Sequence, residues 1–60
     1  MRADEIRIGD ELHVKGQLAY VVEDVIPQSG STITARVRFV DGGEDFRSWH
    51  ADDDVPLTRP

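Results

Sequence analysis

Four residues in the middle of the chain could form a binding surface, because they combine basic and aromatic side chains at strand spacing. These residues are Arg36, Arg38, Arg47 and Trp49. Side chains two positions apart on a strand point to the same face. A strand face that carries basic and aromatic side chains can hold single-stranded nucleic acid or an acidic peptide. The sequence therefore predicts a binding surface at these four residues.

The charge of the chain is divided unevenly, which favours the same surface. The net charge is −5. Residues 31–50 hold three bases and three acids, so the other residues, with four bases and nine acids, carry the whole −5. An acidic total disfavours non-specific binding to nucleic acid, which depends on Lys and Arg neutralising phosphates. A protein partner is therefore the first expectation, and nucleic acid stays open as the alternative for a local basic patch.

Other residue types that could carry chemistry do not form a recognisable site. His13 and His50 would need a nucleophile or an acid held beside them, but the chain has no cysteine and Ser48 is predicted to point into the core. Residues 50–54 (His-Ala-Asp-Asp-Asp) lack the Gly-bearing turn of a calcium loop. No Gly-rich loop precedes a helix that could bind phosphate. We therefore predict two surface histidines, no catalytic residue, no metal and no cofactor.

The elements that would position the binding surface are predicted to be strands. Val and Ile together number 11 and Leu only three, and branching at Cβ suits a pleated surface. Gly and Pro divide the chain into short pieces, as in a small antiparallel barrel or sandwich. We predict an extended entry at residues 3–8 and five strands at residues 11–15, 18–26, 32–39, 45–50 and 55–58. A loop at residues 27–31 joins the second strand to the third, and one helical turn at residues 50–54 precedes the last strand.

Two strands show which of their side chains face the core. In residues 32–39, the side chains of Ile33, Ala35, Val37 and Phe39 share the inner face, and Thr and Arg alternate with them. In residues 18–26 the alternation breaks, and a bulge at Glu23–Asp24 would restore it and bend the strand. In residues 11–15, Leu12 and Val14 are expected to point inward.

The turn at residues 41–44 predicts a hairpin, because adjacent glycines adopt positive φ without steric cost. A two-residue loop at Gly42–Gly43 places Phe39 opposite Phe46 and Val37 opposite Ser48. It also places Arg36 opposite Trp49, within reach of a cation–π contact, and Arg38 opposite Arg47, a repulsion that needs a nearby acid. We predict this register because a slip by one residue moves every side chain to the other face. Whether Trp49 is a core residue or an exposed interface anchor is left open.

Size and composition exclude several classes of protein. A 60-residue chain forms one small domain and buries only about 60% of the surface that its unfolded chain exposes. Without cysteine there is no disulfide to support it. The longest apolar run, residues 18–22, is too short for a membrane helix, and the charged first residues do not resemble a signal peptide. We therefore expect a single domain at residues 1–60, with no membrane association and a cytoplasmic setting.

The order of these elements resembles the SH3-like small β-barrel in its bacterial KOW-like and Tudor-like versions. The resemblance is carried by Ile8-Gly9-Asp10-Glu11-Leu12-His13-Val14, by Tyr20 to Val25, by Val37-Arg38-Phe39-Val40-Asp41-Gly42-Gly43 and by Val55-Pro56-Leu57. The hairpin is similar to that of small actinobacterial proteins of unknown function and of the polymerase-binding domain of CarD-type transcription factors. The resemblance implies an all-β fold, a five-stranded SH3-like antiparallel barrel. A methyl-lysine cage is not expected, because both Phe residues are predicted to lie in the core.

Three functions are consistent with this sequence. The first is a non-enzymatic module that binds another protein through Arg36, Arg38, Arg47 and Trp49, or through an exposed sheet edge. The second is a KOW-like domain that binds nucleic acid with the same face. The third is an enzyme whose pocket forms only when several barrels associate, since a chain this small cannot enclose a large pocket alone. Homo-oligomers are also expected, because the open edges of a small sheet can pair.

Overall fold

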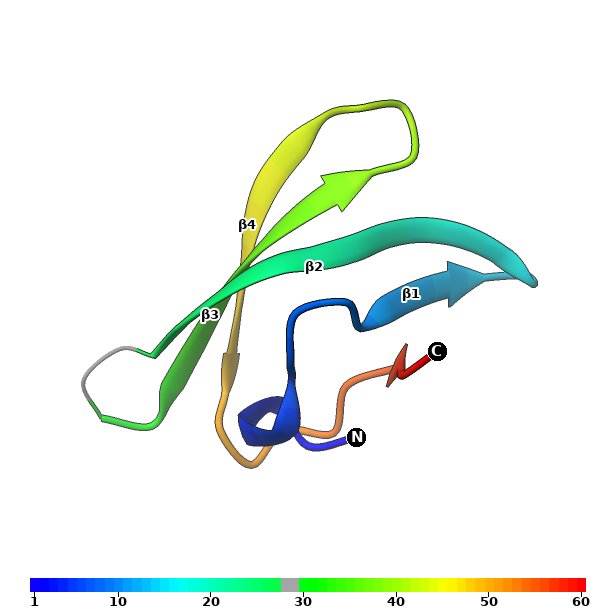
Figure 1. Ribbon diagram of the computed structural model, residues 1–60. Coiled ribbons are helices and arrows are strands. Elements are labelled where there is room, and N and C mark those ends of the chain that lie inside the picture. Colours follow the sequence, from blue (N-terminus) through cyan, green and yellow to red (C-terminus); the bar gives the residue numbers. More distant parts are fainter. Residues whose placement is uncertain (28–29) are drawn as a thin grey trace.

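The computed structural model describes residues 1–27 and 30–60, with the backbone alone at Pro27. Within these residues five antiparallel strands form one sheet in the order β4-β3-β2-β1-β5 (Figure 1). In chain order the elements are η1 (Ala3–Glu5), β1 (Glu11–Val14), β2 (Gln17–Pro27), β3 (Thr32–Phe39), β4 (Glu44–His50) and β5 (Leu57–Thr58). The prediction of an all-β, five-stranded antiparallel fold is confirmed. The sheet is not closed, since β4 and β5 form its two edges. Of the predicted loop at residues 27–31, residues 28 and 29 lie outside the described residues.

The start of the chain differs from the prediction of an extended entry. Ala3–Glu5 forms a 3-10 turn, Ile6 is buried, and Ile8 is exposed. The cause is a long-range contact: the N–H groups of Ala3 and Asp4 donate to the carbonyls of Asp53 and Ala51. Figure 1 shows η1 near the C-terminal end of β4. The prediction of a helical turn at residues 50–54 is wrong, because that segment forms a simple turn. Carbonyls of this turn accept the hydrogen bonds from η1.

Strands β2 and β3 carry the centre of the core. The register of their pairing shifts between Val22 and Asp24, which confirms the bulge predicted at this point. The inner face of β3 is also as predicted, with Ala35 and Val37 fully buried and Ile33 and Phe39 packed against the core. The buried core residues are Ala3, Ile6, Tyr20, Val22, Ala35, Val37, Val55 and Leu57.

Only the first half of β1 faces this core. Leu12 lies opposite Tyr20 on β2 and Leu57 on β5. The register then shifts between Leu12 and His13, so Val14 pairs with Gln17 beside the turn. Val14 is consequently exposed, contrary to the prediction that it points inward. His13 is exposed, as expected.

The hairpin between β3 and β4 has a three-residue loop, Val40 to Gly42, rather than the predicted two-residue loop. Phe39 donates its N–H to the Gly43 carbonyl (2.7 Å), and Gly42 donates to the Phe39 carbonyl (2.9 Å). Gly42 has φ +94°, the left-handed residue that follows a type I turn in this hairpin class. The Asp41 carboxylate accepts the Gly43 N–H at 2.9 Å and stabilises the loop.

The longer loop exchanges the inner and outer faces of β4 relative to the prediction. Arg36 lies opposite Phe46, Ala35 opposite Arg47, Ile33 opposite Trp49 and Arg38 opposite Glu44. Residues directly opposite each other share a face, so Arg47 and Trp49 lie on the inner face and Phe46 and Ser48 on the outer one. The predicted placements of Phe46 and Ser48 in the core are therefore wrong. The predicted pairs Arg36–Trp49 and Arg38–Arg47 are absent from this register.

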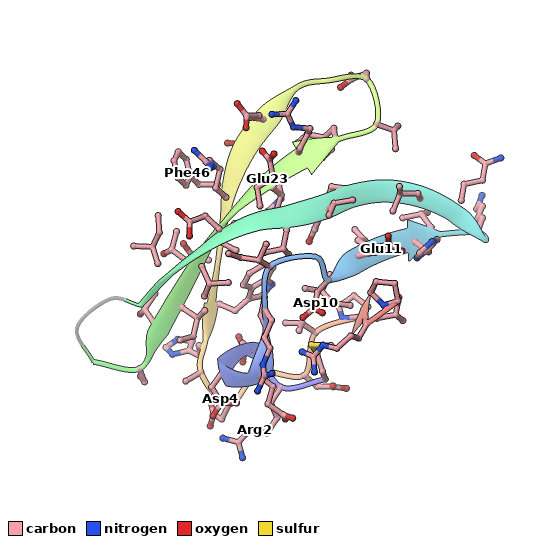
Figure 2. All side chains as sticks on the ribbon, in the orientation of Figure 1. Arg2, Asp4, Asp10, Glu11, Glu23 and Phe46 are labelled. Carbon is pink, nitrogen blue, oxygen red and sulfur yellow. The ribbon has the colours of Figure 1, made fainter. Side chains whose placement is uncertain are left out.

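Asp10 joins the two ends of the chain and is 1% exposed. Its carboxylate accepts the Arg7 N–H (2.8 Å) and two bonds from the Arg59 guanidinium (3.0 and 3.1 Å). Gly9, with φ +97°, permits the turn that returns the Asp10 N–H to the Arg7 carbonyl. Figure 2 places Asp10 just before β1 and beside the C-terminal segment. The sequence indicated a turn at this point but not the ion pair.

The pKa of Asp10 makes the stability of the fold dependent on pH. Burial is the largest single effect and raises this pKa, but the bonds from Arg59 and Arg7 outweigh it, so the pKa is lowered below its ordinary value. A carboxyl whose pKa is lower in the folded state stabilises the fold above its unfolded pKa, and this contribution is lost as pH falls through the folded pKa. We predict a constant urea midpoint from about pH 7 to about pH 5 and a decline below about pH 4. The Asp10→Asn variant should show a shallower decline in urea titrations across this range, and an equal decline would contradict the assignment.

Candidate protein-interaction surface

The four residues predicted to form one surface are divided between the two faces of the sheet. Arg36 and Arg38 lie on the outer face of β3. Arg47 and Trp49 lie on the inner face of β4, where Trp49 is half-buried against the core. The structure therefore brings the residues together in pairs, and the single continuous face that the sequence predicted is not formed.

Arg38 is engaged by acids of the neighbouring strands. Its guanidinium lies 2.9 Å from Glu23 on β2 and 3.5 Å from Glu44 on β4. The pKa of Glu23 is lowered, first by the Glu44 carboxyl and then by Arg38, and the pKa of Arg38 is raised, chiefly by Glu23. Figure 2 shows Glu23 beside the β3–β4 hairpin. These two acids reduce the positive charge that Arg38 presents to a ligand.

Arg47 is engaged by its own strand and by the core. Its guanidinium lies 2.9 Å from Asp45 and 5.3 Å from the centroid of the Phe39 ring. Phe39 in turn packs edge-on against Tyr20, with ring centroids 5.7 Å apart. The cation–π contact is therefore made by Arg47 and Phe39 rather than by Arg36 and Trp49. The side chain of Arg47 serves packing as well as charge.

Arg36 has a different environment, since no described residue lies within ion-pair distance of its guanidinium. It stands opposite Asp24 on β2 and Phe46 on β4. Phe46 is 57% exposed and Ile26, on β2, is 39% exposed; in Figure 2 the Phe46 ring projects away from β4. We call Ile26, Arg36 and Phe46 the outer patch. An exposed aromatic ring beside an arginine is the composition typical of interface hot spots.

The outer patch could not be found from the sequence with the predicted register. Phe46 is the residue that was missed, because the two-residue loop placed it inside. The signal that could have found it lies at the loop: Asp41 followed by Gly42 fits a type I turn with a left-handed glycine as well as adjacent glycines fit a two-residue turn. That alternative loop exposes Phe46 and moves Trp49 against the core.

The free edge of β4 is closed by contacts within the same chain at two of its four outward residues, Phe46 and His50. Because Phe39 bonds to Gly43, the backbone N–H and C=O groups of odd-numbered β4 residues bond to β3. The backbone groups of even-numbered β4 residues point away from β3, toward the free edge of the sheet. The outward Phe46 N–H donates to Asp45 (2.8 Å), and the Phe46 carbonyl accepts from Arg47 (3.2 Å). The His50 N–H donates to the Asp53 carboxylate, and the Asp53 N–H returns to the His50 carbonyl, both at 3.0 Å. A foreign strand that pairs at Phe46 or His50 must therefore first displace these bonds, whereas no described residue bonds to the outward backbone groups of Glu44 and Ser48.

A shallow depression of about 230 Å³ lies where β4 meets the last turn, lined by Thr32, Ser48, Trp49, His50 and Asp53. The Ser48 hydroxyl is bonded to the Thr34 hydroxyl at 2.9 Å, and no hydrogen bond among the described residues joins it to His50. In the described part of the chain no group of three His, Cys, Asp or Glu residues is placed to hold a metal ion. Of the acidic run, Asp53 caps β4 and Asp54 is exposed.

Within residues 1–27 and 30–60 the chain is a small, single-sheet, all-β domain whose outer face carries an exposed Phe–Arg pair. No protein-family model matches the chain, and neither a curated protein nor a solved structure shows significant similarity to it. Among the described residues, no helix has the length and apolar character needed to span a membrane.

Proposed function

We propose that this chain is a non-enzymatic interaction module with an SH3-like small-barrel fold, and that it binds another protein through the outer patch. The observation that carries the proposal is the exposure of Phe46 beside Arg36. A 60-residue domain has little apolar surface to spare for its core, yet this ring packs outside it. Truncation of aromatic and arginine anchors causes the largest losses at protein interfaces. Arg36 has no ion-pair partner among the described residues, so an acidic group of the partner can pair with it.

The outer face is better suited to this role than the sheet edge. Strand addition would need the outward backbone groups of β4, and at Phe46 and His50 these are already bonded. A partner that contacts the outer patch through side chains leaves those bonds intact. Arg38, Arg47 and Trp49, the other residues predicted to bind, retain that role as a prediction: Arg38 borders the outer patch, and the other two lie on the opposite face.

Binding to nucleic acid is the alternative, and the contacts of the arginines do not favour it. Arg38 and Arg47 each lie within 3.0 Å of a carboxylate, which leaves Arg36 as the free charge of this region among the described residues. Affinity for a single-stranded oligonucleotide should then be weak even at low salt. Anisotropy titrations over a salt series test this, since phosphate binding would weaken steeply as salt rises.

The proposal predicts that Phe46→Ala and Arg36→Glu each weaken partner binding by at least about tenfold. Peptides selected from a random display library against the wild-type domain provide the ligand, and titration calorimetry measures the affinity. Val40→Ala is the control for loss of an exposed apolar side chain, and Lys15→Glu is the control for charge reversal. Both control residues are exposed and lie in turns outside the outer patch. Wild-type affinity in both outer-patch variants would reject this surface.

A further inference from the structure

We propose that β4 is also a homodimer interface, in which β4 of a second copy pairs antiparallel with it across a two-fold axis at Phe46. The proposal does not depend on the partner of the outer patch. It rests on the free edge of β4 and on the order of charged side chains along it. The two sheets would join into one, with Phe46 of each copy directly opposite Phe46 of the other.

The charges of β4 match only some registers of such a pair. An axis at Asp45 or at Arg47 would place like charges directly opposite each other, which is destabilising. An axis at Phe46 places Asp45 of each copy opposite Arg47 of the other. These two residues now form an ion pair within one strand, at 2.9 Å. The dimer would replace these two pairs, one in each copy, by two equivalent pairs between the copies.

The backbone groups select the same register. With the axis at Phe46, the next outward pairs join Glu44 of one copy with Ser48 of the other. No described residue bonds to the outward backbone groups of Glu44 and Ser48, and an antiparallel pair of this kind exchanges both of its N–H···O bonds. An axis at Ser48 would instead require His50, whose N–H and carbonyl are both bonded to Asp53. The Phe46 register uses the groups that are free and disturbs one capped residue.

The bonds that the Phe46 backbone already makes limit the strength of the interface. The Phe46 N–H must leave Asp45, and its carbonyl must leave Arg47, before each bonds to Phe46 of the second copy. Each exchange replaces a charge-assisted bond to a side chain by a neutral backbone bond, so it brings no gain of its own. The gain comes from the bonds at Glu44 and Ser48 and from the Phe46 rings, which become cross-strand neighbours. We therefore expect a weak dimer that forms at high protein concentration.

The dimer would also extend the outer patch. Arg36 lies opposite Phe46 in the β3–β4 pairing, so the joined sheet would carry the row Arg36–Phe46–Phe46–Arg36 across its outer face. A partner could then contact two aromatic rings and two arginines at once. Arg36 itself takes no part in joining the copies, so Arg36→Glu should weaken partner binding and leave dimerisation unchanged.

Sedimentation velocity of charge-reversed variants tests the interface. We expect Asp45→Arg and Arg47→Asp each to raise the dimer dissociation constant at least about tenfold, because each places like charges across the axis. An equimolar mixture of the two variants should associate at least as tightly as the wild type. In the mixed dimer one copy carries arginine at both positions and the other carries aspartate at both, so every pair across the axis joins opposite charges. A wild-type chain that stays monomeric at all concentrations, variants that dimerise normally, or a mixture that does not associate would each overturn the proposal.

A cysteine test reports the register even where charge reversal disturbs folding. The chain has no cysteine, so Phe46→Cys introduces a single thiol. Opposed residues of an antiparallel pair lie close enough for a disulfide, and Phe46→Cys should form a disulfide-linked dimer under mild oxidation. Ser48→Cys is the matched control, because its thiols would lie far apart in this register and should remain unlinked. Linkage of the Ser48→Cys variant with none for Phe46→Cys would overturn the register.

Discussion

Replacement of Asp10 by alanine should lower the free energy of unfolding by about 3 kcal/mol, at the lower end of the cost of breaking a buried ion pair. The substitution leaves the Arg7 N–H without its acceptor and releases Arg59, which otherwise ties the C-terminal segment to Glu5 and Asp10. Arg59 is about half exposed, so it regains water and the cost stays at this lower end. For a domain of this length the total stability is on the order of 3–9 kcal/mol. The loss is therefore at least about a third of the total stability, and the urea midpoint should fall by a similar fraction.

Urea titration followed by circular dichroism measures this loss, and two further variants interpret it. Asp10→Asn keeps an oxygen that can accept the Arg7 N–H but loses the charge that attracts Arg59, so it should cost about half as much. Asp52→Ala removes an exposed aspartate of the last turn and should change stability by less than about 0.5 kcal/mol. If Asp10→Ala were no more costly than Asp52→Ala, the Asp10–Arg59 contact would not hold the ends of the chain together.

The parts of the fold that the sequence predicted correctly are those that depend on local alternation. The eight residues of β3 alternate without interruption, so their inner face could be assigned before any partner strand was known. The β2 bulge was predictable for the same reason, since Val22 and Val25 can both face the core only if one extra residue separates them. In each case the signal lies within one strand and needs no knowledge of its neighbours.

The parts that failed depend on contacts between distant segments. Ile6 and Ile8 alternate as a strand would, but hydrogen bonds to Ala51 and Asp53 fold the preceding residues into a 3-10 turn. Asp10 has the composition of an exposed turn residue, and its partner Arg59 is 49 positions away. Nothing in the local sequence distinguishes a buried aspartate from an exposed one when the pairing residue is so distant.

The predicted arrangement of the candidate surface was wrong for a related reason, which concerns the register of β4. Its large apolar residues, Phe46 and Trp49, are three positions apart, so a strand cannot place both on one face. The pattern therefore leaves the inner face undecided, and only the loop length determines it. The two-residue loop places Phe46 inside and the three-residue loop places Trp49 inside. Every error in the predicted surface, including the position of Arg47, follows from that single choice.

This choice can be measured, because the two registers predict opposite costs for truncating the two aromatic residues. Trp49 is half-buried against the core, and Trp49→Ala should lower the free energy of unfolding by about 2 kcal/mol, less than for a fully buried tryptophan. Phe46 is exposed, and Phe46→Ala should cost about 0.5 kcal/mol, the range of surface substitutions. Urea midpoints of both variants give the comparison, and Val40→Ala, in the exposed loop, supplies the baseline. A larger loss for Phe46→Ala than for Trp49→Ala would restore the two-residue loop, return Phe46 to the core and remove the basis of both the outer patch and the β4 dimer.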